Sequence, residues 1–119
     1  MIVKSDVLPD WTFVGGGFQS YEFVLRAEDG SYYDLPNAQV NLAIAEYVNP
    51  DHLVFQLDTM VTANKEGMNC IAAFTLSPSN TASLAGRYIY QITVRSSDGI
   101  IAPPLRGRMF VVKNINPNF

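Results

Sequence analysis

Apolar and polar residues alternate along five stretches of this sequence, which is the pattern of β-strands that bury one face. In residues 87–95, one face collects aromatic and aliphatic side chains, those of Tyr88, Tyr90, Ile92 and Val94. The same alternation runs through residues 20–26, 38–45, 53–61 and 68–76. We therefore predict five strands here, and no stretch shows the apolar stripe of an amphipathic helix.

Two weaker stretches, residues 11–14 and 108–113, bring the expected number of strands to about seven. Tight turns are predicted between strands at two pairs of residues, Asp29-Gly30 and Asp98-Gly99. Both pairs favour a reversal of the chain, because glycine adopts a positive φ at little cost and aspartate tolerates it.

Three consecutive glycines, residues 15–17, separate the first predicted strand from the second. A phosphate-binding loop would need a following helix with a lysine, and residues 18–21 provide neither. We interpret the glycines as a flexible loop. Farther along, residues 77–84 are small and polar with Pro78 near their start, which favours one helical turn between two strands.

Residues 84–90 read Leu-Ala-Gly-Arg-Tyr-Ile-Tyr and place Tyr88 at the start of a late strand, just after a turn. This is the position of the tyrosine corner in Greek-key sandwiches, where the hydroxyl group binds backbone a few residues upstream. An ordinary half-buried strand tyrosine is the alternative.

The strands and turns together predict an all-β protein: an immunoglobulin-like antiparallel β-sandwich of about seven strands with Greek-key connections. A partly open barrel is the competing architecture. The length of 119 residues suits a single domain, residues 1–119, with a short N-terminal arm over residues 1–18.

Composition removes several classes of function. A net charge of −3 and a pI near 4.9 disfavour nucleic-acid binding. Cys70 is the only cysteine and His52 the only histidine, which excludes an intramolecular disulfide and a multi-histidine metal site. We predict a buried Cys70, a solvated His52, no cofactor, no metal and no enzymatic activity.

Membrane insertion and calcium binding find little support. No apolar stretch approaches the ~20 residues that cross a bilayer, and residues 1–8 lack the apolar core of a signal peptide, so we predict no membrane contact. Glu28, Asp29 and Asp34 have oxygen ligands for Ca²⁺ but lack the spacing of a calcium loop, and we interpret them as solvated turn acids.

Charge is divided unevenly along the chain. Residues 1–60 carry two bases and nine acids, a balance of −7, and residues 61–119 carry six bases and two acids, a balance of +4. If the halves lay on opposite surfaces, copies could stack head to tail. We favour local neutralisation, because Greek-key connections interleave early and late strands.

Aromatic residues near the termini are candidates for an interaction surface: Trp11, Phe13, Phe18 and Phe119. Exposed aromatic side chains often mark contacts between proteins. The alternative is that these rings fold back onto the domain.

Two sets of motifs carry a family resemblance. The first set lies in residues 23–40, which combine a strand, an acidic turn at Gly30 and a segment that begins Tyr33-Asp34-Leu35. The second set lies later in the chain: residues 84–90 form a Leu-x-Gly-x-Tyr-x-Tyr strand, and residues 107–112 form a closing strand that begins Gly-x-x-Phe. Over about residues 20–113 the chain resembles the N-terminal immunoglobulin-like domain of phage baseplate upper proteins, with Pro36-Asn37 in place of the usual Thr-Gly.

This resemblance implies a virion structural protein of the tail or baseplate, made in the host cytoplasm. Its partners would be other phage structural proteins, and we expect a homo-oligomer. The resemblance brings no catalytic residues. The alternative hypothesis is a carbohydrate- or cell-surface-binding sandwich that stacks sugars on Trp11, Tyr32 and Tyr33.

Overall fold

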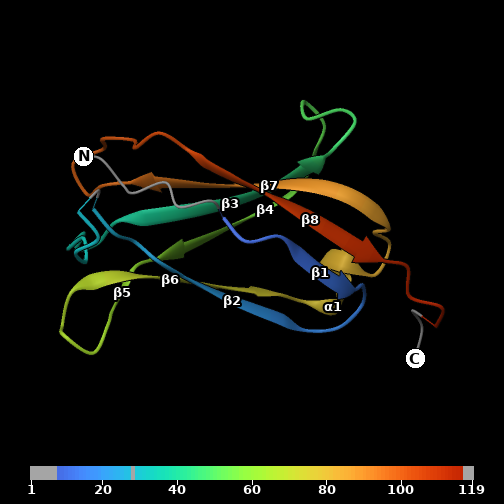
Figure 1. Ribbon diagram of the computed structural model, residues 1–119, viewed down its shortest axis with the longest axis horizontal. Helices are drawn as coiled ribbons and strands as arrows, with labels where there is room; N and C mark the ends of the chain where they lie inside the picture. The colour runs from blue at the N-terminus through green and yellow to red at the C-terminus, as the bar shows by residue number, and fades with distance from the viewer. Residues whose placement is uncertain (1–7, 28, 117–119) are drawn as a thin grey trace.

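The computed structural model describes residues 8–27 and 29–116 of the chain. This part contains eight strands and one helical turn, joined by turns and loops (Figure 1). In chain order they are β1 (Trp11–Val14), β2 (Gln19–Val24), β3 (Gln39–Glu46), β4 (Leu53–Met60), β5 (Thr62–Ala63), β6 (Asn69–Leu76), α1 (Pro78–Thr81), β7 (Gly86–Arg95) and β8 (Leu105–Val112). Each strand predicted from alternation is present, with ends that agree to within about three residues.

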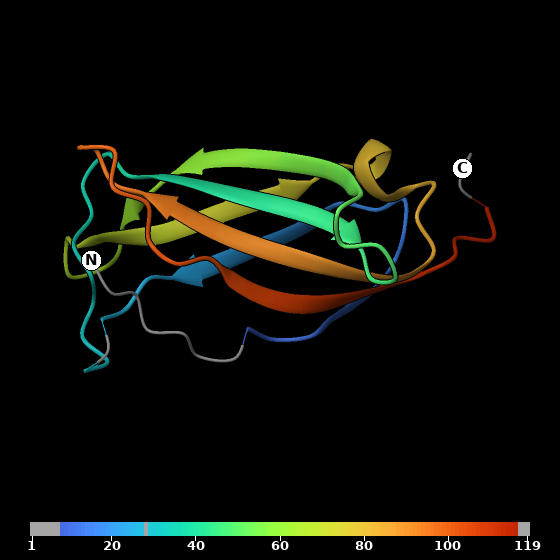
Figure 2. The ribbon, with the colours of Figure 1, turned by 90° about the horizontal axis from the view of Figure 1, so that it is seen from above.

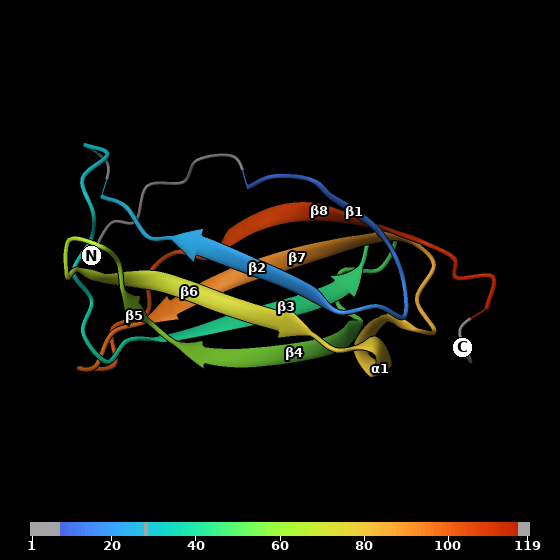
Figure 3. The same cartoon turned by 90° about the horizontal axis from the view of Figure 1, so that it is seen from below.

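The strands form two sheets that pack face to face. One has five strands in the order β1-β8-β7-β3-β4, and the other has three in the order β2-β6-β5. Figure 2 shows the larger sheet from above, and Figure 3 shows the smaller sheet from below. The chain crosses between the sheets after β1, β2, β4 and β6, so the fold is an immunoglobulin-like β-sandwich, as predicted. The two separate sheets are inconsistent with a partly open barrel.

The sandwich differs from the predicted one in two ways. β5 was not predicted, because two residues are too short to show an alternation. β1 pairs with β8 in parallel, with Trp11 opposite Met109, whereas the other neighbouring strands are antiparallel. Residues 11–14 therefore belong to the five-stranded sheet and not to the N-terminal arm predicted over residues 1–18.

A stack of three aromatic rings fills the core beneath β1. The Trp11 ring lies between Tyr21 of β2 and Tyr90 of β7, with centroids 3.8 and 3.9 Å away and interplanar angles of 10° and 3°. Trp11 is only 5% exposed. Each such aromatic pair adds about 0.5–1.5 kcal/mol beyond the burial of its area. The stack thus joins the first strand to both sheets.

Tyr90 is the most constrained member of the stack. Its hydroxyl donates a hydrogen bond to the Pro9 carbonyl oxygen at 2.5 Å, and its ring lies against Gly107 of β8. A Cβ atom at residue 107 would overlap that ring, so the glycine leaves the room that the Tyr90 ring occupies over β8. Burial raises the pKa of the Tyr90 hydroxyl above its ordinary value, and the charge of Asp10 adds to the effect.

The three glycines between β1 and β2 form a loop, as predicted, that packs against α1 and the segment after β8. The Gly16 N–H donates to Thr81 Oγ1 at 2.9 Å, and Asn114 Nδ2 donates to the Gly15 carbonyl at 2.7 Å. Thr81 is fully buried. A side chain at residue 15 would overlap the Thr81 carbonyl, which explains why the loop begins with glycine.

Candidate functional site

Three arginines gather on the outer face of the five-stranded sheet, over β7 and β8. Alternation places Arg87 on this face of β7 and Arg106 and Arg108 on this face of β8, and all three are exposed. Two exposed rings and one partly exposed aliphatic side chain lie among them. We call this surface the arginine face, and its residues are Tyr47, Arg87, Ile89, Arg106, Arg108 and Phe110.

The register of the sheet sets the arrangement of these side chains. Along β8, Arg106, Arg108 and Phe110 follow one another at alternate positions and form one row. Their neighbours on β7 are Gln91, Ile89 and Arg87, in that order. The row therefore presents two guanidinium groups and then an aromatic ring, with a third guanidinium beside the ring.

A hydrogen bond orients one of the three guanidinium groups, and an ion pair lies at a second. Arg106 Nε donates to Gln91 Oε1 at 2.9 Å. Arg108 Nε lies 3.5 Å from Asp10 Oδ1, and both side chains are more than half exposed. An exposed ion pair of this kind contributes about 0–1 kcal/mol, so it positions Arg108 without holding it firmly.

Three adjoining hollows lie on the arginine face, with volumes of about 280, 200 and 160 Å³. Arg108 and Tyr47 line the two larger ones, and Arg106 and Ile89 are shared by the second and third. The third extends over β3, where the outward side chains of Ala43 and Ala45 are small. They leave a depression between the larger outward side chains of the neighbouring strands. The surface is thus shaped to receive projecting side chains.

The local neutralisation that we favoured from the sequence is present only in part: Asp10 from the first half pairs with Arg108 from the second. Arg87, Arg95, Arg106 and Arg108 all lie on this outer face. β3 and β4 do interleave with the later strands, but they bring one carboxylate to it, that of Asp58, which accepts a hydrogen bond from Asn41 Nδ2 at 2.9 Å. The positive balance of residues 61–119 is therefore concentrated on one sheet.

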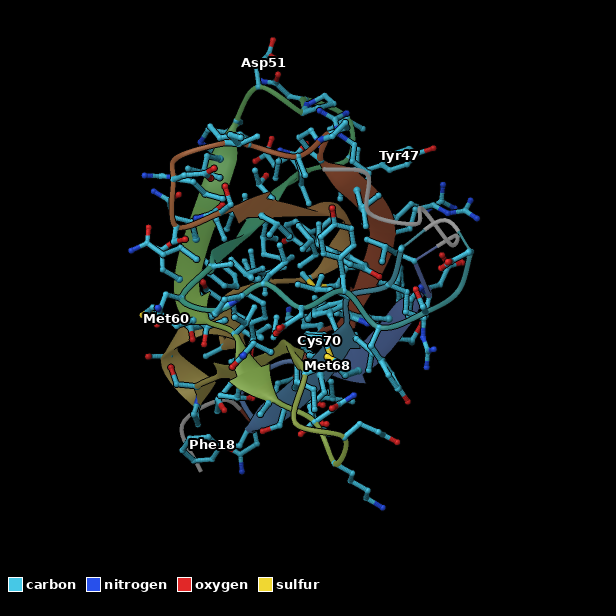
Figure 4. All side chains as sticks on the ribbon, turned by 90° about the vertical axis from the view of Figure 1, so that its left-hand side faces the viewer. Phe18, Tyr47, Asp51, Met60, Met68 and Cys70 are labelled. Atoms are coloured by element: carbon cyan, nitrogen blue, oxygen red, sulfur yellow. The ribbon has the colours of Figure 1, made fainter. Side chains whose placement is uncertain are left out.

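The aromatic residues predicted to form an interaction surface do not lie together. Trp11 and Phe13 are 5% and 8% exposed, so that part of the prediction is wrong: both side chains point into the core because β1 is a strand and they occupy its inward positions. Phe18 is 74% exposed in the loop after β1, and Figure 4 shows it at the rim of the molecule, like Tyr47. Phe119 lies outside the described residues.

Tyr88 lies near the start of β7, where a tyrosine corner would place it. Its hydroxyl accepts a hydrogen bond from the Ala85 N–H at 3.1 Å and donates one to the Ala85 carbonyl at 3.2 Å. Both contacts reach backbone three residues upstream, and they fix the path by which the chain enters β7. Tyr88 therefore has a structural role.

The remaining candidate residues from the sequence either make local polar contacts or are buried. His52 lies in the exposed turn before β4, with Nδ1 2.9 Å from Glu46 Oε1, and Cys70 is fully buried toward the centre of the molecule (Figure 4). Asp29 accepts two hydrogen bonds from Ser31, and Asp34 accepts two from Asn69. These bonds lower the pKa of both carboxyl groups.

No metal site is evident in residues 8–27 and 29–116, where no three His, Cys, Asp or Glu side chains are grouped to hold an ion. The described part of the chain also has no helix that is long and apolar enough to span a membrane. A sugar-stacking platform built on Trp11 is inconsistent with its burial. The Arg26 guanidinium lies over one face of the Tyr32 ring, 4.5 Å from the centroid, and Tyr32 stays 37% exposed.

Comparisons with known proteins find similar solved structures but no family. No protein-family model matches this sequence, and no curated protein matches it. Among solved structures it is similar to CopC from Methylosinus trichosporium OB3b, with 18% identity and a TM-score of 0.45 over 89% of this chain and 87% of that one. It is also similar to a fibronectin(III)-like module of CbhA from Clostridium thermocellum, with 9% identity and a TM-score of 0.43 over 94% and 95%. At these values the similarity carries no inference about function.

The arginine face was not predicted from the sequence. Its signals were present: the positive balance of the second half, and two arginines two positions apart near the last strand. The strand was predicted to begin at residue 108, which left Arg106 in the preceding loop. Only the pairing of β7 with β8 shows that Arg87 joins them.

Proposed function

We propose that this chain is a non-enzymatic assembly module that binds other proteins through the arginine face. The observation that carries the proposal is the gathering of Arg87, Arg106 and Arg108 with the exposed rings of Tyr47 and Phe110 on one open sheet face. Arginine and aromatic residues are the types most enriched at protein interfaces and at the few positions that dominate binding energy.

The chemistry of this face suits a protein partner. Arginine carries an apolar stem beneath its charged end, so it contributes contact area as well as hydrogen bonds. Tyr47 and Phe110 are each 43% exposed, which leaves apolar surface that a partner would cover. The hollows beside them would accept side chains of that partner.

The assembly that we propose is a phage or prophage virion, in its tail or baseplate. The resemblance of residues 20–113 to the first domain of phage baseplate upper proteins supports this part of the proposal. The protein would be made in the host cytoplasm, form a homo-oligomer and contact other virion proteins.

Purified particles from a strain that produces the phage would test the proposal, with mass spectrometry of the particles and light scattering of the isolated protein. We expect the wild-type chain in the particles. A variant with Arg106→Gln and Arg108→Gln should be incorporated less, and Arg95→Gln, which removes a charge elsewhere on the same sheet, should be incorporated normally. A chain that is a strict monomer and absent from particles would contradict the proposal.

A further inference from the structure

We infer that the partner of the arginine face is an extended protein segment with two carboxylates and an apolar residue at successive alternate positions. This inference rests on the proposed protein-binding function and specifies the chemistry of its partner. It follows from the charge of the face, from the one carboxylate already bound there, and from the spacing of the side chains along β8.

The charge of the face selects a negatively charged partner. Among the described residues that line the three hollows, Arg87, Arg106 and Arg108 are basic and Asp10 alone is acidic. A second copy that presented the same face would bring arginines against arginines, which opposes a symmetric face-to-face dimer. Carboxylates are the complementary group on a protein.

Asp10 shows how a carboxylate approaches this surface. Its Oδ1 lies 3.5 Å from Arg108 Nε, and both side chains remain mostly solvated. A guanidinium group has five N–H donors in a planar fork and binds a carboxylate best through two of them. Arg108 therefore keeps donors free for a carboxylate from outside, and Asp10 competes for the same group.

The spacing along β8 sets the pattern of the partner. Arg106, Arg108 and Phe110 stand at alternate positions of one strand, so neighbouring members of the row are separated by about 7 Å along it. An extended segment repeats with the same spacing. Side chains at its positions i, i+2 and i+4 would meet the two arginines and the ring, which calls for two carboxylates followed by an apolar residue.

The apolar component distinguishes a protein segment from an acidic polysaccharide. Leu8, Ile89 and Tyr47 line one hollow together with the two arginines of β8, and Phe110 lines another. Sulfated or carboxylated sugars carry charge but no apolar side chains to fill these places. A segment of the type Glu-x-Glu-x-Leu supplies both.

Fluorescence anisotropy with the full chain tests this inference. The probe is a labelled synthetic peptide with the core Glu-Ser-Glu-Ser-Leu, and the matched peptides replace both glutamates by glutamine or place them side by side. We expect the first peptide to bind at least about tenfold more tightly than either control, and added salt to weaken its binding.

Variants of the chain locate the site. Arg106→Gln combined with Arg108→Gln should weaken binding of the first peptide about tenfold. Phe110→Ser should weaken it several-fold. Arg95→Gln is the matched control and should change it less than about twofold. Asp10→Asn should strengthen binding about two- to fivefold, because it frees Arg108. Thermal unfolding midpoints confirm that each variant is folded.

Three outcomes would overturn the inference. One is that the first peptide shows no saturable binding, and another is that Arg95→Gln weakens its binding as much as the combined Arg106→Gln and Arg108→Gln change does. The third is that heparin, an acidic polysaccharide, binds as strongly as the peptide and that Phe110→Ser does not affect its binding. Its failure is distinguishable from failure of the proposed function. A chain found in particles that ignores the peptide would refute the inference alone, and a chain that binds the peptide but is absent from particles would refute the virion assignment alone.

Discussion

The two faces of the β7–β8 pair are built from the same two strands and have opposite characters. The inner face carries Tyr90, Ile92, Met109 and Val111, all of them buried. The outer face carries four arginines, Arg87, Arg95, Arg106 and Arg108, and Phe110, all exposed. Because side chains of a strand alternate, each residue of one kind is next in sequence to a residue of the other.

In each of these two strands, the inner residues therefore determine the stability of the fold, and the outer residues determine what the surface can bind. Inner residues are fixed by packing against Trp11 and the opposite sheet, so changes there act on the free energy of unfolding. Outer residues have few fixed contacts, so changes there act on what the surface can bind. The predictions below test this separation, from the largest expected effect on stability to the smallest.

Trp11→Ala should cost about 3–5 kcal/mol of stability, because it empties the space between Tyr21 and Tyr90. Phe18→Ala, an aromatic truncation seven residues later at an exposed position, should change stability by less than about 0.5 kcal/mol. Urea unfolding measures both, and Trp11→Phe serves as a milder variant if the alanine variant does not fold. A Trp11→Ala chain as stable as the wild type would refute the role assigned to the stack.

Tyr90→Phe should cost about 0.5–1.5 kcal/mol near neutral pH, because the Pro9 carbonyl loses its donor. Burial raises the pKa of Tyr90 above its ordinary value of about 10, so the folded state keeps the proton that the unfolded state loses. Stability that is fully present below pH 10 should therefore fall as the pH rises above 10, less steeply in the phenylalanine variant. Unfolding measured at several alkaline pH values checks this, and parallel curves for the two chains would contradict it.

Arg106→Gln combined with Arg108→Gln should leave the free energy of unfolding within about 0.5 kcal/mol of wild type, since both side chains are exposed and the one ion pair described between them and the rest of the chain is weak. Thermal or urea unfolding measures this. A larger loss would show that the outer face also supports the fold, and the separation between the two faces would be lost.

Most of the fold could be predicted because alternation is a local property. Residues 87–95 show five outward and four inward positions in sequence alone, and the structure places Tyr90, Ile92 and Val94 in the core as expected. The parallel pairing of β1 with β8 could not be predicted, because it joins residues 98 positions apart, such as Trp11 and Met109. The burial pattern of β1 was only weakly indicated, because the exposed Val14 is apolar like the buried Trp11 and Phe13.

The candidate site was harder to predict for a related reason. A set of surface residues has no period of its own, and Arg87 lies about twenty residues before Arg106 and Arg108 in the sequence. They meet because β7 and β8 are neighbours, which is a property of the sheet order. Trp11 and Phe13 occupy the inward positions of β1, and Phe18 lies exposed in the loop that follows it.

The pairing of the first strand with the last has a consequence for how the protein is made. During translation, β1 leaves the ribosome while the strand it pairs with has yet to be synthesised, so β1 cannot take its place in the sheet until residues 105–112 have emerged. Trp11 is also the only tryptophan of the chain. Its intrinsic emission should therefore report when β1 packs against Tyr21 and Tyr90 and joins the two sheets.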